Sequence, residues 1–186
     1  IIGNDTANGS TQKMTLAAWI YKAGDGGVSG HEYGRIFQFG TGTAGPMLYT
    51  DANDRVWFNA AFSSTIGAWK STNAGVITNP AGTPKWHHVV LTYDASSVNN
   101  DPEIYVDGQK IAVSEQTTPV GNYSGIYVGS DSSDCYIGNT KGGTRTFEGN
   151  MADAAVWNRI IDPDELQAIF NASKLSDIYG PGTSYD

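Results

Sequence analysis

Apolar and polar residues alternate along most of this chain, in the pattern typical of β-strands. The stretch Trp86–Val113 shows the pattern best, because apolar side chains occupy both faces of the pleat between Val89 and Tyr93. A strand with two apolar faces is expected in the middle of a sheet. The dipeptide Asp107-Gly108 then suits a two-residue type I′ turn, which would return the chain as a hairpin.

Similar patterns elsewhere predict an all-β chain, an antiparallel β-sandwich of the jelly-roll kind with about a dozen strands. Further strands are expected at Met14–Tyr21, Arg35–Phe39, Met47–Thr50, Arg55–Phe62, around Trp69, at Val76 and Ile77, and at Ile126–Gly129, Cys135–Gly138 and Met151–Arg159. The polar segment Glu115–Gly125 is expected to be a loop. One short C-terminal helix is predicted, with Asp162 as N-cap, Pro163 at N1 and Glu165 at N3.

The length of 186 residues fits one sandwich domain with its own core. We expect this domain at residues 1–174, followed by an exit segment or linker at 175–186. The single cysteine, Cys135, cannot form an intramolecular disulfide and is expected to be a small buried side chain in its strand. The first residues read as a strand already under way, which suggests part of a larger polypeptide or assembly.

The formal net charge of −8 narrows the range of partners. It argues against binding to the phosphate backbone of nucleic acid or to an anionic membrane surface. It favours neutral ligands, cationic partners or bound cations. No run approaches the roughly 18 apolar residues that a membrane-spanning helix needs, so membrane insertion is not expected.

Four segments of the chain stand in an order that one known family shares. They are MTLAAWIY at 14–21, WHHVVLTYD at 86–94 followed by IYVDG at 104–108, CYIGN at 135–139, and FEGNMADAAVWNRIIDPDELQAIF at 147–170. Together they resemble the laminin G-like branch of the concanavalin A-like lectin/glucanase superfamily, over roughly residues 1–172. The resemblance implies the jelly-roll fold. It implies little about activity, because such sandwiches serve as sugar binders, adhesion modules and structural parts alike.

No catalytic arrangement is visible in the sequence. The glucanase side of the superfamily needs two carboxylates on one strand face, about 5 Å apart if configuration is retained. The glutamates here are scattered, and most aspartates fall in predicted turns. His87 and His88 are neighbours on a strand and point to opposite faces, which favours packing over a shared catalytic or metal site. We therefore expect a protein that is not an enzyme.

Two functions of different classes remain open. The first is a non-catalytic recognition module that binds a neutral glycan, with sugar rings stacked on exposed aromatic side chains. The candidate ligand-binding residues are His31, Tyr33, Trp69 and Tyr123. The alternative is a structural or adhesion module of a larger assembly, such as a virion surface or tail component, that works through protein contacts. Either function is expected outside the cell or on the surface of a particle.

Calcium is a candidate structural cofactor at two places. Asp51, Asn53 and Asp54 form an acidic turn whose oxygens suit a hard cation, although the turn does not match an EF-hand loop and also suits plain turn formation. Asp153 is an acid on an otherwise apolar strand face. The family resemblance implies that an acid there ties the last strand to the start of the chain, either by a direct hydrogen bond or through calcium.

Overall fold

The computed structural model describes residues 12–26, 32–40, 45–78, 85–124 and 134–172. The regular secondary structure of this part of the chain consists of eleven strands and one helix that follows them. In chain order the elements are β1 Lys13–Lys22, β2 Arg35–Phe39, β3 Met47–Thr50, β4 Val56–Ala60, β5 Gly67–Ser71, β6 His87–Asp94, β7 Glu103–Val106, β8 Gln109–Ile111, β9 Val113–Thr117, β10 Cys135–Ile137, β11 Gly149–Trp157 and α1 Pro163–Ala172.

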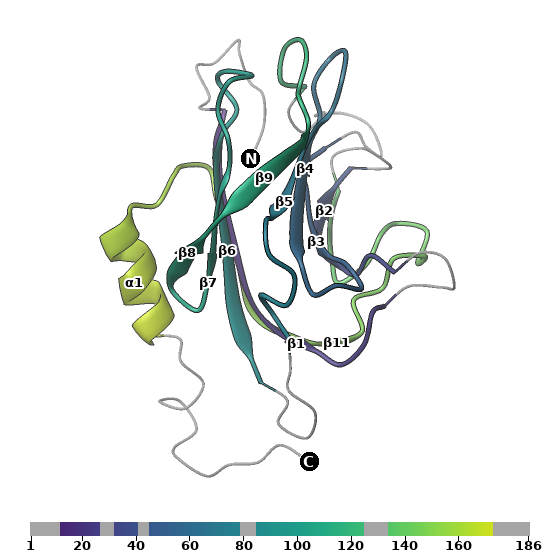
Figure 1. Ribbon diagram of the computed structural model, residues 1–186, viewed down its shortest axis with the longest axis vertical. Helices are drawn as coiled ribbons and strands as arrows, with labels where there is room; N and C mark the ends of the chain where they lie inside the picture. Colours follow the sequence, from purple (N-terminus) through teal and green to yellow (C-terminus); the bar gives the residue numbers. More distant parts are fainter. Residues whose placement is uncertain (1–11, 27–31, 41–44, 79–84, 125–133, 173–186) are drawn as a thin grey trace.

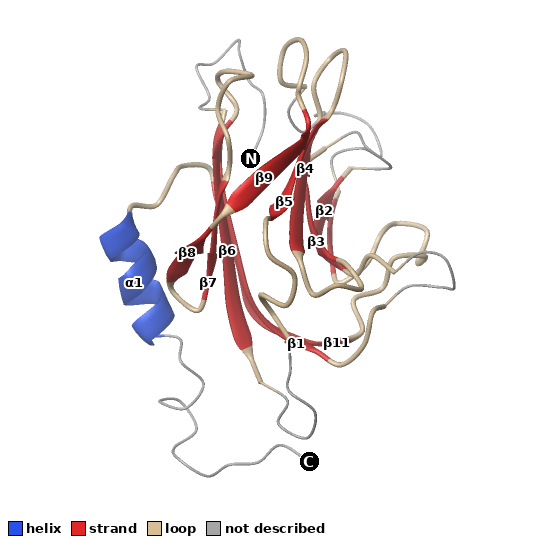
Figure 2. Ribbon diagram, viewed as in Figure 1, coloured by secondary structure: helices blue, strands red, loops and turns tan. Residues whose placement is uncertain are grey.

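The strands form two sheets that pack face to face (Figures 1 and 2). The five-stranded sheet has the order β11-β1-β6-β7-β8, and the six-stranded sheet has the order β10-β2-β3-β4-β5-β9. Every pairing is antiparallel. The predicted antiparallel β-sandwich is confirmed, and β6 is the central strand of its sheet as expected.

The interior lies between the two sheets and is built from alternate residues of their strands. Phe58, Trp69 and Tyr93 form its aromatic centre, with ring centroids 5.2 to 5.9 Å apart. Other fully buried members include Met14, Leu16, Ile20, Ile36, Phe37, Leu48, Ile77, Leu91 and Ile104. The hydroxyl of Tyr93 has no hydrogen-bond partner among the described residues, and burial raises its pKa.

Helix α1 covers the outer face of the five-stranded sheet, as Figure 1 shows. Leu166 of the helix packs with Ala17, Val90 and Tyr105, which are the outward side chains of β1, β6 and β7. The helix begins as predicted, because the backbone N–H of Glu165 donates to the Asp162 carboxylate at 2.8 Å. A second apolar layer therefore exists outside the sandwich.

Asp107 fastens the hairpin to the central strand. Its φ of 53° and the φ of 77° at Gly108 are those of the predicted type I′ turn. Its carboxylate accepts the backbone N–H of His88 at 3.0 Å and lies 3.0 Å from both His87 Nδ1 and Lys85 Nζ. His87 and His88 are both buried, on opposite faces of β6. His87 contacts the Asp107 turn, and His88 packs against Trp19 and Phe170.

Several sequence-based expectations differ from the structure. The predicted loop Glu115–Gly125 begins within the edge strand β9, Val113–Thr117, which pairs with β5 although most of its side chains are polar. Cys135 is exposed and not buried, because β10 is an edge strand. Val76 and Ile77 lie in a turn and not in a strand. The strand expected at 126–129 lies outside the described residues.

No helix in the described part of the chain has the length and apolar character needed to cross a membrane.

Burial in the fold opposes the protonation of His88. Only 2% of the residue is exposed, and its ring lies between Trp19 and Phe170 at centroid distances of 5.1 and 5.8 Å. Burial lowers its pKa from 6.5 to about 4, although Asp107 and Asp153 act in the opposite direction. The folded chain thus favours the neutral imidazole.

We predict that His88 makes folding sensitive to moderate acid. The folded state takes up a proton on His88 less readily than the unfolded state does, so protonation favours unfolding. Its contribution is therefore complete above about pH 6.5 and is lost as the pH falls toward 4. The loss should be about 3 kcal/mol in the free energy of unfolding. Urea denaturation of the native chain and of His88→Phe across this range checks it, because the variant keeps an aromatic ring but lacks the titrating group.

Below pH 4 the native protein and the His88→Phe variant should lose stability to the same extent. There Asp107 takes up its proton. Burial raises its pKa, but hydrogen bonds from His87 and Lys85 outweigh burial and hold the pKa at about 2. The same pH dependence in both chains between pH 6.5 and 4 would contradict the role of His88.

Candidate functional site

The structure does not bring the four predicted ligand-binding residues together. His31 lies outside the described residues. Tyr33 is 40% exposed at the end of the sandwich where β2 begins, and Tyr123 lies at the opposite end, beside the residues that precede β1. Trp69 is in neither place. The four residues therefore do not form one site.

Trp69 is an interior residue, and the prediction that it binds a ligand is wrong. It is fully buried in β5 between Phe58 and Tyr93. Its indole Nε1–H donates to the Asp101 carboxylate at 2.7 Å. The register of the six-stranded sheet sets Trp69 opposite Phe58, whose side chain faces inward, so its ring cannot present a face to a sugar.

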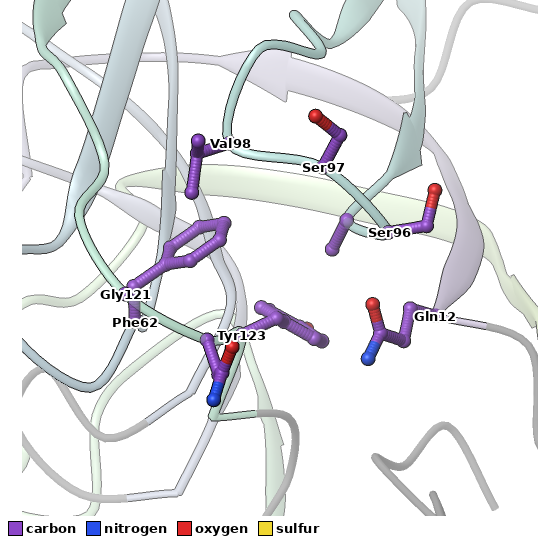
Figure 3. Close-up of a pocket in the computed structure, with 9 residues that line it drawn as sticks. Gln12, Phe62, Ser96, Ser97, Val98, Gly121 and Tyr123 are labelled. Atoms are coloured by element: carbon purple, nitrogen blue, oxygen red, sulfur yellow. The ribbon is translucent and has the colours of Figure 1, made fainter.

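A cavity of about 360 Å³ opens at the end of the sandwich that contains Tyr123. Four separate segments meet there. The backbone N–H of Ala95 donates to the carbonyl of Gln12 at 2.8 Å, and an isolated bridge pairs Phe62 with Tyr123. The lining residues are Gln12, Phe62, Ala95, Ser96, Ser97, Val98, Gly121, Asn122 and Tyr123. Figure 3 shows Phe62 and Val98 on one side of this space and Gln12 and Ser96 on the other.

The chemistry of this cavity is polar and uncharged. The side-chain amides of Gln12 and Asn122 each offer a donor and an acceptor, and the structure records no hydrogen bond from either amide to another described residue. Ser96 adds a hydroxyl, while Phe62 and Val98 add apolar surface. Such a lining can bind a neutral molecule that carries several hydroxyl groups on an apolar ring.

Sequence reasoning found Tyr123 of this cavity and missed its amide and serine residues. Tyr123 is almost completely buried, and its ring contacts Phe62 edge to face at 5.5 Å. It forms part of the cavity wall and does not present a stacking platform. The other lining residues carry no local motif, since only the pairing of distant segments brings them together.

The acidic turn after β3 is closed by a lysine. Lys22 Nζ lies 2.6 Å from the Asp54 carboxylate, 2.9 Å from the Asp25 carboxylate and 3.1 Å from the carbonyl oxygen of Asp51. Burial lowers the pKa of Lys22, but its hydrogen bonds to Asp54 and Asp25 outweigh burial and raise the pKa above its ordinary value. The ammonium group therefore stands where a cation would be held.

The other oxygens of this turn also have donors. The Asp51 carboxylate accepts the backbone N–H groups of Asn53 and Arg55, at 2.9 and 3.0 Å, and the indole N–H of Trp57 at 2.8 Å. As arranged, the residues do not fit a calcium ion. Calcium at Asp51, Asn53 and Asp54 stays a prediction, and it requires Lys22 to move.

Asp153 lies on a β-bulge of β11, with a φ of 48°. Its side chain is exposed. The tie between the last strand and the first is made by Thr15, whose hydroxyl donates to the carbonyl of Arg159 at 2.7 Å and accepts the N–H of Ile161 at 3.2 Å. Calcium at Asp153 also stays a prediction, and among the described residues no group of three His, Cys, Asp or Glu side chains is placed to hold a metal ion.

Comparison with known proteins identifies a family for most of this chain. The model of the concanavalin A-like lectin/glucanases superfamily matches residues 2–167. Neuronal pentraxin-2 of Cavia porcellus is 26% identical over 91 residues, which are 48% of this chain and 21% of the pentraxin.

Solved structures give the same picture of the fold. A candidate carbohydrate-binding protein of Bacteroides ovatus ATCC 8483 is 25% identical with a TM-score of 0.55, over 83% of this chain and 40% of that chain. The CBM40 module of the Ruminococcus gnavus IT-sialidase, bound to α2,6-sialyllactose, is 16% identical with a TM-score of 0.59, over 87% and 84% of the two chains. This chain thus spans less than half of the pentraxin and of the Bacteroides protein.

Trp69 is predicted to contribute to stability and not to binding. Trp69→Ala should lower the free energy of unfolding by about 3–5 kcal/mol, because it leaves a large cavity in the aromatic centre. Asp101→Asn keeps an acceptor for the indole and should lower it by less than about 2 kcal/mol. Chemical denaturation measures both values. A well-folded Trp69→Ala protein with a native midpoint would contradict this assignment.

Lys22 is predicted to hold the acidic turn together. Lys22→Met should lower the free energy of unfolding by about 2–3 kcal/mol at pH 7, because it leaves the carboxylates of Asp25 and Asp54 without their shared cation. Lys13→Met is the matched control, since its ion pair with Asp94 is solvent-exposed and should contribute less than about 1 kcal/mol. Equal losses in the two variants would show that the buried ammonium has no special role.

Thermal melts of the native protein in calcium and in chelator check the calcium prediction. An ion that binds only the folded chain must raise the melting temperature. Identical melts in the two buffers would contradict a calcium site.

Proposed function

The chain belongs to the concanavalin A-like lectin/glucanases superfamily, and from that premise we propose that it is a non-catalytic recognition module that binds a neutral glycan. The proposed site is the cavity beside Tyr123. The module would act outside the cell or on the surface of a particle, where glycans are displayed.

The uncharged hydrogen-bonding lining of the cavity carries this proposal. Its volume of about 360 Å³ lies in the range of small-ligand sites, roughly 300–1,000 Å³. The amides of Gln12 and Asn122 would bind sugar hydroxyls, while Phe62 and Val98 would contact the apolar face of the ring. None of the nine lining residues carries a charge, which favours a neutral sugar over an ionic ligand.

The comparisons support a sugar as the ligand. Two proteins similar in fold are a candidate carbohydrate-binding protein and a sialidase module bound to an oligosaccharide. The same cavity supports a non-catalytic role, because glycoside hydrolysis needs a pair of carboxylates and no acid is among the described residues that line it.

One observation favours a second function, assembly through protein contacts. Apolar side chains are exposed on two of the four strands at the edges of the described sheets, with Ile137 of β10 54% exposed and Val156 of β11 37% exposed. Exposed apolar residues on unpaired strand edges are a common basis for association with another chain. A structural or adhesion module of a larger assembly would use these edges and would need no sugar.

A glycan array, run in calcium and again in chelator, tests the proposed function. We expect binding to one or more neutral glycans. Gln12→Ala combined with Asn122→Ala should weaken it about 10- to 100-fold, since two hydrogen bonds of about 1 kcal/mol each are lost. Gln167→Ala combined with Asn171→Ala is the matched control, because it removes the same two amides from helix α1.

The possible results separate the two functions. Loss of binding in the cavity variant, with binding intact in the helix variant, would support the proposed site. Absence of any glycan signal from a folded, monodisperse sample in both buffers would favour the assembly function.

A further inference from the structure

Three cations gather on the outer face of the six-stranded sheet. Arg35, Tyr49, Trp57 and Lys70 stand opposite one another across β2, β3, β4 and β5. The guanidinium carbon of Arg35 lies 4.4 Å from the centroid of the Tyr49 ring, and Lys70 Nζ lies 4.8 Å from that of the Trp57 ring. The two rings stack at 5.8 Å with an interplanar angle of 14°. A cation therefore stands at each end of an aromatic pair.

Tyr33 and Arg145 extend this row at its Arg35 end. Tyr33 contacts Tyr49 edge to face at 5.9 Å, and the guanidinium carbon of Arg145 lies 5.3 Å from the centroid of the Tyr33 ring. The backbone N–H of Arg35 donates to the carbonyl of Arg145 at 3.1 Å, which joins the two arginine-bearing segments. We call these six residues, Tyr33, Arg35, Tyr49, Trp57, Lys70 and Arg145, the cationic face.

The cations of this face lack acidic partners. Within the described part of the chain, Lys13, Lys22, Arg55, Lys85, Lys110 and Arg159 each pair with a carboxylate. No ion pair joins Arg35, Lys70 or Arg145 to any described carboxylate. In a chain of net charge −8, three unpaired cations on one surface make it complementary to an anion.

The carboxylate next to the row does not neutralise it. Asp51 accepts the indole N–H of Trp57 at 2.8 Å, and its carboxylate lies 3.9 Å from the guanidinium of Arg55. It is thus committed to the turn after β3. The positive charge at the Arg35 end of the row is left uncompensated.

Among the three cations, Arg35 is the most unfavourable for the stability of the fold, because its charge is buried without an anionic partner among the described residues. Only 9% of the residue is exposed. Its Nε donates to Gln38 Oε1 at 2.9 Å and its Nη1 to the carbonyl of Tyr33 at 3.4 Å, so both recorded acceptors are neutral. Burial lowers its pKa to about 10, and nearby Arg145 acts in the same direction. A buried cation without an anionic partner destabilises a fold, whereas a bound anion would remove the penalty.

We propose that the cationic face binds a carboxylate-bearing sugar, with Arg35 and Arg145 receiving the carboxylate. Guanidinium groups form the strongest hydrogen bonds to carboxylates in proteins, often two at once. Tyr33 is 40% exposed and offers ring surface to the apolar side of a sugar, whereas the Trp57 ring lies between Tyr49 and Lys70. Asn59 adds a polar side chain, whose Oδ1 accepts a hydrogen bond from the Tyr49 hydroxyl at 3.2 Å. Its NH₂ group is a hydrogen-bond donor of the kind that a sugar hydroxyl can accept.

This inference does not depend on the neutral-glycan proposal. The cavity beside Tyr123 is lined by different residues, none of which belongs to the cationic face. The double variant Gln12→Ala with Asn122→Ala should therefore leave binding at the cationic face unchanged.

A titration with glucuronic acid and with glucose tests the inference, because the two sugars differ only in the carboxylate at C6. Chemical shifts of the ¹⁵N-labelled protein and the fluorescence of its tryptophans are followed at low ionic strength. We expect glucuronic acid to perturb residues of the cationic face and glucose to leave them unchanged. The affinity should fall as salt is raised, since the ion pairs are partly exposed.

Substitutions of single cations separate recognition from packing. Arg35→Gln and Arg145→Gln should each weaken glucuronic acid binding at least tenfold, and Arg35→Gln should leave the melting temperature unchanged or raise it. Lys110→Gln is the matched control, because it removes an exposed cation from the other sheet. Its binding of glucuronic acid should equal that of the native protein.

Three results would overturn the inference. Equal responses to glucose and glucuronic acid would show that the carboxylate is not recognised. A lower melting temperature in Arg35→Gln with unchanged binding would make Arg35 a packing residue only. Full competition by free glutamate or a short acidic peptide would show that the face reads a carboxylate without a sugar.

Discussion

Burial of both faces of β6 is the constraint on which the rest of the structure depends. One face closes the interior with Leu91 and Tyr93, and the other carries Val90 and His88 outward. An apolar outer face on the middle strand of a sheet would be exposed to water unless a further element covered it. Helix α1 is that element, and the Thr15 contacts to the segment between β11 and α1 place the helix over the strand.

The parts of the fold that could be predicted are those where burial leaves a mark on the sequence. Strands β1 and β6 carry apolar side chains on both faces, and Asp162 and Pro163 are typical residues for the start of a helix. Strand β9 leaves no such mark, because its side chains are polar and it is held by backbone pairing with β5. The prediction that Cys135 is buried is wrong for a related reason. Cysteine is usually buried, but on this edge strand its side chain is exposed to solvent.

The proposed binding surfaces are harder to predict from the sequence, because they depend on register and on pairing between distant segments. Trp57 and Trp69 both occur in short alternating strands, and the sequence does not say which ring faces inward. The pairing of Phe58 with Trp69 and of Tyr49 with Trp57 decides it, and places one tryptophan inside and the other outside. The lining of the cavity likewise comes from four parts of the chain, and only Tyr123 among its residues is predicted as a ligand-binding residue from the sequence.

Lys22 of β1, which contacts the turn after β3, has a consequence for the conditions under which this end of the domain keeps its shape. A cation supplied by a dissolved ion leaves when that ion becomes scarce. The ammonium of Lys22 is tethered to β1 by its own covalent chain and stays beside Asp54 and Asp25 whatever the composition of the surrounding fluid. In this arrangement the positive charge beside the two carboxylates comes from a covalently bound side chain, so its presence there does not depend on the concentration of a free ion.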